Sequence, residues 1–275
     1  VFLWLRAQRA LAAVMVGAAL AVAGVLVQGL FRNPLAEPGI IGINAGAALG
    51  MQAVLIVGIV LPGFFGAVLP LVVLVPLGGV AGGLLSLVLL LAVAKRCQDS
   101  LGVLLAGVVM SLLFAGLGAA LTASVQDHIQ LARALMVFSL GGLDAKGQEH
   151  LLLAGPLIAG GLLAAWGWAR QLDLLLTGED EAASLGVDLV LVRRWLIVWA
   201  TFLVAGAVAL AGNIAFVALV VPHLLRGFLG PLHHRLLPAA ALGGALFVLL
   251  CDMLVRLLPT VGEMPLGVVT GLVGA

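Results

Sequence analysis

Long apolar runs separated by short polar breaks fill the chain from end to end. A helix that crosses the hydrocarbon core of a bilayer needs about 20 apolar residues. Nine runs approach or reach that length and are predicted to enter the membrane: residues 10–30, 39–61, 69–94, 101–124, 149–168, 195–212, 213–230, 236–258 and 262–275. The run 134–140 is too short to span and predicts a re-entrant or interfacial helix.

The break between the first two runs contains two prolines, Pro34 and Pro38, together with Arg32, Asn33 and Glu37. Proline interrupts a continuing helix, and it also disfavours helical backbone at the residue before it. Non-helical backbone at membrane depth is tolerated where protein groups or a water-filled cavity provide hydrogen-bond partners for its N–H and C=O groups. The stretch predicts a turn at the mouth of a pathway, with an ordinary interhelical loop as the alternative.

The most polar stretch is residues 171–194, and it predicts a surface element between two spans. Residues 179–185 form a short amphipathic pattern, with Thr177 as the expected N-cap and Gly186 as the residue that ends the helix. An acid-rich helix attached to a membrane bundle is either a simple connector or a docking element for a soluble partner.

Small residues recur at four-residue spacing inside the second and third runs. The pattern is Gly42, Gly46 and Gly50 in one run, and Gly78 with Gly82 in the next. This spacing allows another helix to approach closely. It predicts tightly packed helix pairs and not a phosphate-binding loop.

Composition agrees with a membrane bundle: 64% of residues are hydrophobic, 9% are charged, and the mean hydropathy is +1.29. The sequence therefore predicts a polytopic all-α protein in contact with membrane lipid. A net charge of +1 gives no indication of nucleic-acid binding. The chain contains no catalytic or nucleotide-binding motif, no cofactor signature and no metal-ligand spacing, so we expect neither an enzyme nor a cofactor protein. A transporter without its own ATP site or mid-span carboxylates needs power from a partner.

Basic residues indicate the orientation of the bundle, because they accumulate on the cytoplasmic side. Strict alternation of the spans places eight on one side, which we expect to be cytoplasmic: Arg32, Lys95, Arg96, Arg170, Arg193, Arg194, Arg226 and Arg235. The other side receives five: Arg6, Arg9, Arg133, Lys146 and Arg256. Arg6, Arg9 and Arg256 lie at helix ends and predict a cationic rim for an acidic partner.

The whole chain, residues 1–275, is predicted to be a single membrane domain with a weak inverted repeat. Val22-Ala-Gly-Val precedes the first proline break, and Val204-Ala-Gly-Ala precedes Pro222. The helices that follow would run in opposite directions, as in inverted-repeat transporters. The expected halves are roughly residues 1–142 and 149–275, with the polar segment 171–194 between spans of the second half.

Several motifs, taken in order, resemble the permease family of ABC importers for iron–siderophores, haem and cobalamin. They begin with Gln28, Arg32-Asn-Pro-Leu-Ala, Pro38, Gly42 and Gly46. They continue with Leu104-Leu-Ala-Gly, Gly178-Glu-x-x-Ala-x-x-Leu-Gly-Val, Val221-Pro-His-Leu-Leu-Arg, Asp252-xxx-Arg256 and Glu263-Met-Pro-Leu-Gly. The resemblance implies a ten-helix type II importer permease in a bacterial inner membrane. It also implies a second permease copy, cytoplasmic ATPase subunits and a periplasmic substrate-binding protein as partners.

The resemblance also implies roles for individual residues. It assigns Asn33, Leu35, Asp99 and Ser100 to a cytoplasmic gate. It assigns an ATPase-coupling loop to Gly178, Glu179, Glu181, Ala182, Leu185 and Gly186. Arg6, Arg9 and Arg256 match arginines that dock the binding protein. A ferric siderophore is the expected cargo, with haem or cobalamin as the alternatives.

The chain departs from the family pattern in ways that leave other interpretations open. The first family helix and the end of the last are expected to be missing from this sequence. Ala215 and Ala218 stand where the family favours glycine, and the added methyl groups predict a crowded helix contact. An ion-gradient transporter and a degenerate, non-transporting paralogue are therefore retained as alternatives of another class.

Overall fold

The computed structural model describes residues 2–61, 71–94, 100–125, 135, 138–143, 147–257 and 264–274. Over these ranges every regular element is helical, which confirms the all-α prediction. In chain order the elements are α1 (Phe2–Phe31), the 3₁₀ helix η1 (Pro38–Ile41), α2 (Ile43–Val60), α3 (Leu71–Ala94), α4 (Ser100–Ser124), α6 (Gln148–Gly167), α7 (Ala169–Leu175), α8 (Glu179–Ser184), α9 (Leu189–Ala211), α10 (Val217–Leu229), α11 (His233–Leu257) and α12 (Leu266–Gly274).

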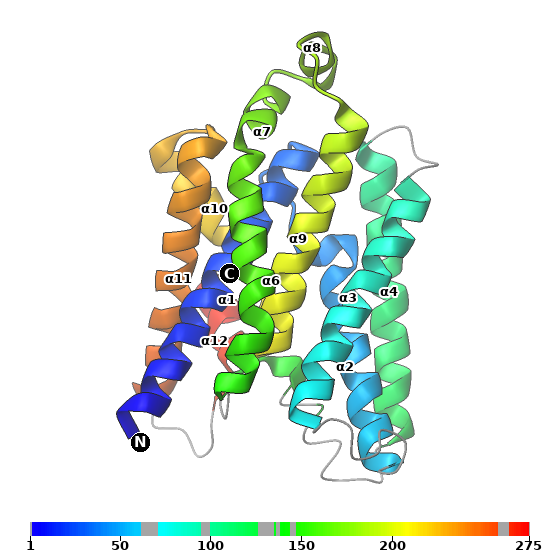
Figure 1. Cartoon of the computed structure of the whole chain (residues 1–275), viewed down its shortest axis with the longest axis vertical. Helices are drawn as coiled ribbons and strands as arrows, with labels where there is room; N and C mark the ends of the chain where they lie inside the picture. The colour runs from blue at the N-terminus through cyan, green and yellow to red at the C-terminus, as the bar shows by residue number, and fades with distance from the viewer. Residues whose placement is uncertain are drawn as a thin grey trace.

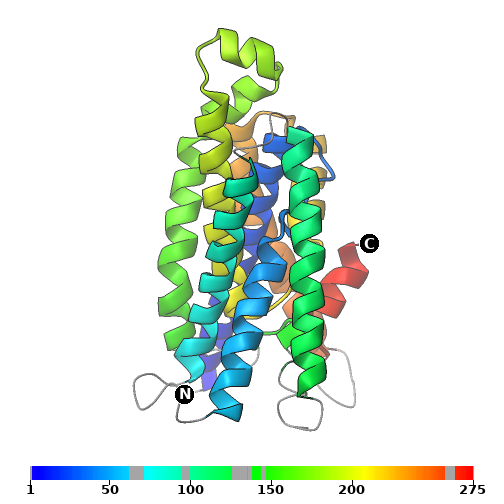
Figure 2. The same cartoon turned by 90° about the vertical axis from the view of Figure 1, so that its right-hand side faces the viewer.

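Helices α1 and α9 form the centre of the bundle and are the most buried of its long helices. They pack against each other and run in opposite directions, since α1 ends and α9 begins near the end that carries α7 and α8 (Figure 1). α10 and α11 cover α1 on one side, α2, α3 and α4 lie on the other, and α6 packs on α9. The short helix α8 projects beyond the end of the bundle (Figure 2).

Seven helices in the described ranges are long and apolar enough to cross a membrane. The prediction that residues 213–230 form a span is wrong, because α10 has 13 residues. At 1.5 Å per residue such a helix is about 20 Å long, short of the roughly 30 Å hydrocarbon core. Residues 212–216 are not helical, and this break takes up the start of the predicted run.

Several helix boundaries lie further out than the apolar runs suggested. α1 begins at Phe2 and so includes Arg6 and Arg9, while α9 begins at Leu189 and includes Arg193 and Arg194. The predicted helix at 134–140 lies largely outside the described residues, and only its last three residues form a described helical stretch. Charged side chains near a helix end find water or an ion-pair partner, as Arg9 does with Asp252 and Arg193 with Glu179, so they do not stop the helix.

The glycine spacing of the second and third runs brings α2 and α3 into backbone contact, as predicted. A Cβ added at Gly50 would lie 2.1 Å from the carbonyl oxygen of Gly78, and one at Gly82 would lie 2.1 Å from that of Gly46. These two pairs interlock along one seam. Any larger residue at either position would force the two helices apart.

Candidate functional site

The proline break after α1 is a hydrogen-bonded turn. Arg32 adopts left-handed backbone (φ 47°), and the N–H groups of Arg32 and Asn33 donate to the carbonyls of Gly29 and Gln28. This is a Schellman motif with arginine at the position that glycine usually occupies. The Asn33 side-chain oxygen then accepts the N–H of Leu35 at 2.9 Å. The sequence Arg32-Asn-Pro-Leu therefore ends α1 sharply and turns the chain back.

The returning segment enters the bundle as η1, which packs on α4 and α2. The hydroxyl of Ser111 in α4 donates to the carbonyls of Gly39 and Ile40, at 2.9 and 3.2 Å. A short helix that ends inside a membrane protein leaves carbonyl groups that need donors. The Ser111 hydroxyl is such a donor for the carbonyls of η1. The chain between α1 and α2 therefore departs from α-helix, as predicted, and hydrogen bonds from α4 satisfy its backbone.

α10 is fastened to the end of α1 by Gln28, which is only 2% exposed. Pro222 lacks an N–H, so the carbonyl of Ala218, four residues earlier, has no normal helical donor. The Gln28 amide nitrogen lies 3.4 Å from that carbonyl oxygen and 3.3 Å from that of Leu219. Arg226 donates to the Gln28 amide oxygen at 3.0 Å. The side chains of Gln28 and Arg226 and the two carbonyls form one network that joins the two helices.

Ala218, where a crowded helix contact was expected, packs against a glycine on the opposite helix. Gly24 of α1 faces Ala218 so closely that a Cβ there would lie 1.9 Å from the Ala218 carbonyl oxygen. Ala218 is buried in this contact, whereas Ala215 lies in the loop before α10 at the edge of a cavity. The absence of a side chain at position 24 allows this close approach of the Ala218 backbone, and the crowding expected from the Ala218 methyl group stays a prediction.

Glu37 joins the same turn to the start of α10. The backbone N–H of Phe216, the residue before α10, donates to the Glu37 carboxylate. Burial raises the pKa of Glu37 above its ordinary value, and this hydrogen bond offsets part of the effect. An anionic group at a helix N-terminus is also favoured by the helix dipole. The sequence reasoning noted Glu37 only as a break in the apolar pattern and missed this role.

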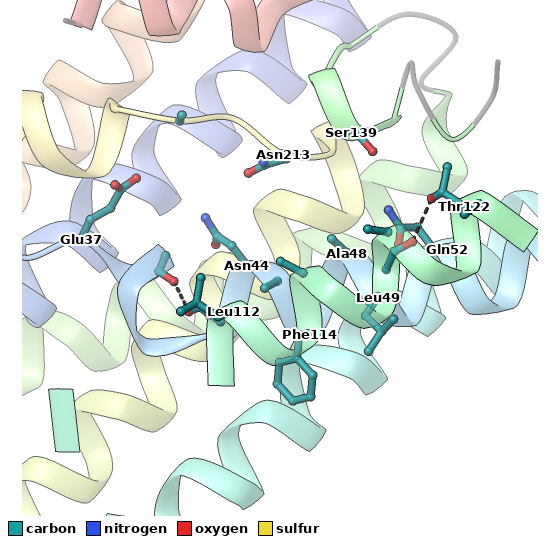
Figure 3. A pocket seen from close by; sticks show the side chains of 18 residues that line it. Glu37, Asn44, Ala48, Leu49, Gln52, Leu112, Phe114, Thr122, Ser139 and Asn213 are labelled. Atoms are coloured by element: carbon teal, nitrogen blue, oxygen red, sulfur yellow. Dashed lines mark hydrogen bonds between the residues drawn. The ribbon is translucent and has the colours of Figure 1, made fainter. Parts of the chain in front are cut away.

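A cavity of about 690 Å³ lies between α2, α4 and the loop before α10. Figure 3 shows Asn44 and Asn213 on facing sides of it, with Gln52 and Thr122 further along. Alanine and glycine residues on the facing sides of α2 and α4 leave the space open. The lining residues are Glu37, Gly39, Asn44, Ala45, Ala48, Leu49, Gln52, Ser111, Leu112, Phe114, Ala115, Gly118, Ala119, Thr122, Ala123, Ser139, Asn213 and Ala215.

The residues assigned to a gate lie at the end of the bundle that carries α7 and α8. Asn33 and Leu35 are exposed in the turn after α1. Ser100 is the first residue of α4, which begins near the same end (Figure 1). Asp99 lies outside the described residues. The structure therefore places three of the four residues at one end of the bundle, and their role stays a prediction.

The residues assigned to a coupling loop form α8 and its flanks, and Thr177 is not the N-cap. Gly178 holds that position, and the Thr177 hydroxyl donates back to the carbonyl of Leu174. Ala182 is the buried residue of α8, whereas Glu181, Leu185 and Gly186 are exposed. Glu179 lies 3.5 Å from the guanidinium of Arg193 on α9.

Gly186 ends α8 as the sequence predicted. Its backbone is left-handed (φ 85°), its N–H donates to Ala183, and the N–H of Val187 donates to Ala182. At the other end of the helix, a Cβ at Gly178 would lie 2.3 Å from the Glu181 carboxylate and 4.0 Å from the guanidinium of Arg32. The turn after α1 and the helix α8 thus meet around Gly178.

The opposite end of the bundle holds the residues assigned to docking. Asp252 of α11 is fully buried, and its carboxylate accepts hydrogen bonds from Arg9 and from Arg256. The Arg9–Asp252 contact measures 2.7 Å at its shortest. Asp252 and Arg256 are four residues apart and form an ion pair on one face of α11. Arg9 joins them from α1, so two of the three predicted rim arginines share one internal carboxylate.

His233 and His234 are the first two residues of α11. Asp173 of α7 accepts the backbone N–H of His233 at 2.5 Å and contacts both imidazoles, at 2.9 and 3.4 Å. Partial burial alone would raise the pKa of Asp173, but the hydrogen bonds from the two histidines lower it overall. This contact fixes α7, and with it the base of α8, to α11.

The described basic residues lie in two groups, one at each end of the bundle, as the alternation of spans predicted. Arg6 and Arg9 lie near the start of α1 and Arg256 near the end of α11, at the end away from α8 (Figure 1). Six basic residues lie at the end that carries α8. They follow α1, lie in α7, or lie near the start of α9, the end of α10 and the start of α11: Arg32, Arg170, Arg193, Arg194, Arg226 and Arg235. Lys95, Arg96, Arg133 and Lys146 lie outside the described residues.

Comparison with known proteins places this arrangement among transport proteins. The family model described as the FecCD transport family matches residues 1–275. The chain is 39% identical to the hemin transport system permease protein HmuU of Yersinia pestis, covering 100% of this chain and 80% of that protein. It is 38% identical to the Fe(3+) dicitrate transport system permease protein FecD of Escherichia coli (98% and 81% covered). It is also 39% identical to the vitamin B12 import system permease protein BtuC of Klebsiella pneumoniae (100% and 80%).

Two solved structures are similar in fold. A metal-chelate type ABC transporter in an inward-facing conformation matches with a TM-score of 0.88 and 32% identity, over 98% of this chain and 82% of that one. A chain of PsaBC from Streptococcus pneumoniae matches with a TM-score of 0.60 and 17% identity, over 96% and 86%. The second likeness concerns the fold alone. The first agrees with the sequence relatives.

Proposed function

The chain belongs to the FecCD transport family of metal-chelate, haem and cobalamin permeases, and on that premise we propose that it is the membrane subunit of an ATP-driven importer for a metal chelate. It is a multi-pass membrane protein. We propose that it lies in the inner membrane and works with cytoplasmic ATPase subunits, a periplasmic binding protein and a second permease copy. The chain itself supplies the path and not the ATP hydrolysis.

The observation that carries this proposal is the position of α8. It projects from the basic end of the bundle and exposes Glu181 and Leu185, and it meets the turn after α1 around Gly178. A soluble partner that moves α8 would act directly on the base of that turn. This supports the coupling role proposed for Gly178, Glu179, Glu181, Ala182, Leu185 and Gly186.

Association with an ATPase subunit tests the coupling role. The double variant Glu179→Arg, Glu181→Arg is expected to lose most of the ATPase that co-purifies with the tagged chain, because both charges on α8 reverse. Glu181→Arg alone is the cleaner variant, since Glu179 also contacts Arg193. Glu149→Arg, at the exposed start of α6, is the matched control. ATPase recovery equal to wild type in both α8 variants would contradict the role.

We propose that Arg6, Arg9 and Arg256 dock an acidic surface of the binding protein. Asp252 holds Arg9 and Arg256 in place but balances only part of their charge. Arg6→Glu is expected to weaken docking about tenfold, and raised salt should weaken wild-type docking as well. Arg235→Glu, near the opposite end, is the control. Unchanged, salt-insensitive docking of the Arg6 variant would refute the rim.

We propose that Asn33, Leu35, Asp99 and Ser100 form half of a cytoplasmic gate that a second permease copy completes. If two copies meet there, Leu35→Cys is expected to cross-link between copies in the closed state, and ATP should reduce the cross-linking. If ATP does not change the cross-linking yield of Leu35→Cys, Leu35 is not part of the gate.

The cavity and the ion pairs bear on the ion-gradient alternative. That mechanism needs a carboxylate that can take up and release an ion within the membrane. Asp252 is held by two arginines, and Glu37 accepts the N–H of Phe216. Both of these carboxylates have partners among the described residues, and this supports the proposal of an importer driven by a partner's ATP cycle.

A further inference from the structure

We propose that Asp173 is a positioning residue that joins the coupling loop to the bundle, so that a displacement of α8 is passed to the start of α11 and to the last turn of α1. This inference rests on the proposed function, because it assumes an ATPase that acts on α8. It goes further, since it names the contact through which that action would reach two of the membrane spans.

α7 and α8 are connected by successive hydrogen-bonded turns. The N–H groups of residues 176–178 donate to the carbonyls of residues 173–175, three positions earlier in each case. The N–H of Ala182 then donates to the carbonyl of Gly178, the N-cap of α8. Figure 1 shows α7 between the bundle and α8. A displacement of α8 is therefore expected to move α7 with it.

Asp173 of α7 caps the start of α11 from a different helix. The first N–H groups of a helix have no acceptor inside it, and that of His233 donates to the Asp173 carboxylate at 2.5 Å. The same carboxylate oxygen lies 2.9 Å from Nδ1 of His233, and the other lies 3.4 Å from Nδ1 of His234. Burial works against the ionised carboxyl, but hydrogen bonds from both histidines outweigh it and place the pKa of Asp173 below its ordinary value. The dipole of α11 also favours a charged carboxylate at this position.

The reach of this cap distinguishes it from an ordinary one. Asp188, the residue before α9, accepts the N–H of Leu191 at 3.0 Å, three positions along the same segment. Asp173 and His233 are 60 positions apart. Loss of the local cap loosens one helix end, whereas loss of the distant cap also removes a contact between two helices.

The same contact adjoins the last turn of α1. A Cβ added at Gly29 would lie 2.7 Å from Cδ2 of Leu172 in α7 and 2.8 Å from Nε2 of His233 in α11. Leu172 and the His233 side chain are almost completely buried there. The Gly29 carbonyl accepts the N–H of Arg32, the first residue after α1. The helices α1, α7 and α11 therefore meet at Gly29, at the base of the turn assigned to the gate.

These contacts form a continuous connection from α8 to two spans. Backbone hydrogen bonds join α8 to α7, Asp173 joins α7 to α11, and both helices pack against α1 at Gly29. Removal of the Asp173 carboxylate is expected to leave α8 able to bind the ATPase, while α11 no longer follows its movement.

Hydrogen exchange measured by mass spectrometry tests this connection in the complex of the chain with its co-purified ATPase, in lipid nanodiscs. Exchange is compared with and without a non-hydrolysable ATP analogue. In the wild-type complex we expect the analogue to change the exchange rate about threefold in residues 169–186, 233–237 and 28–32. In Asp173→Ala the change in residues 169–186 should remain, and the other two should be lost.

Two further variants separate this role from a loss of folding. Asp173→Asn keeps an oxygen acceptor for the N–H of His233 and should recover about half of the response in α11. Gly29→Ala keeps the carboxylate but places a methyl group against Leu172 and His233, and it should weaken the response in residues 233–237. Both of these neighbours are side-chain atoms that can shift, so the variant is expected to fold.

Asp188→Ala is the matched control, because it also removes a carboxylate cap from the start of a membrane helix. It should raise the basal exchange of residues 189–192 and leave the nucleotide response of α11 unchanged. ATPase recovery with Asp173→Ala should equal that of wild type, since the exposed residues of α8 are untouched. A purely structural role of Asp173 would change basal exchange at the start of α11 but not its response to nucleotide.

Three results would overturn the inference: no nucleotide response in residues 233–237 of the wild-type chain, a response in Asp173→Ala equal to wild type, or an equal loss of response in Asp188→Ala. Each of them leaves the proposed function intact if the ATPase co-purifies with the wild-type chain. Failure of the wild-type chain to recruit an ATPase would instead refute the proposed function and, with it, this inference.

Discussion

Gln28 and Gln52 are two buried glutamines in apolar helices, and their surroundings differ in one respect. The Gln28 amide bonds on both sides, to the carbonyls of Ala218 and Leu219 and to the guanidinium of Arg226. The Gln52 oxygen bonds to no described residue and is packed against Gly118 of α4. A satisfied buried amide holds elements together, whereas an unsatisfied one lowers stability.

The difference extends to the helices around each residue. Around Gln28 the contact is backbone against backbone, since Gly24 meets the carbonyl of Ala218 directly. Around Gln52 the neighbour is Gly118, and a Cβ there would meet only the tip of the Gln52 side chain, at 2.6 Å. The first region is built to be rigid. The second has room to adjust, because a side-chain tip can move.

The largest expected effect distinguishes these two glycines. Gly24→Ala should destabilise the protein by about 3 kcal/mol, at the upper end of overpacking costs, because a backbone carbonyl blocks the new methyl group. Gly118→Ala is the matched change beside Gln52 and should cost less than about 1 kcal/mol, because a side-chain tip can move. Denaturant unfolding of the two variants in detergent measures the difference. Equal losses would mean that both regions are equally rigid.

A smaller effect is expected from Gln28→Met, which should cost about 2 kcal/mol. The substitution leaves the Ala218 carbonyl without the donor that replaces the missing N–H of Pro222, and it leaves Arg226 without its acceptor. Gln28→Glu keeps an acceptor for Arg226 and should recover part of the loss. If Gln28→Met unfolds at the wild-type midpoint, the network contributes nothing to stability and the contrast with Gln52 fails.

The smallest expected effect on stability is that of Gln52→Met, between zero and a gain of about 1 kcal/mol, since methionine removes an unsatisfied amide from the core. Calorimetry in the absence of chelate checks this. A clear loss of stability would show that the Gln52 amide has a structural partner, and the two glutamines would then belong to one class.

The apolar runs and the glycine spacing were sufficient to predict most of the fold. The spans of α1 to α4, the close packing of α2 on α3 and the end of α8 at Gly186 follow from length, small residues and turn chemistry, all of which are local. Two predictions failed at breaks and caps that the apolar pattern does not mark. α10 is shorter than its run because residues 212–216 do not form a helix, and the Thr177 hydroxyl bonds to the preceding helix instead of capping α8.

The sequence by itself determined that this is a helical membrane protein, where its polar breaks fall and which family it resembles, since these depend on hydrophobicity and local motifs. The tertiary structure decided which polar residues act together. Gln28 with Arg226, Arg9 with Asp252 and Asp173 with His233 are separated by 198, 243 and 60 positions. Folding also determined that the Gln28 amide is satisfied while the Gln52 oxygen has no partner among the described residues, because hydrogen bonding depends on neighbours that the chain supplies only when its distant helices pack.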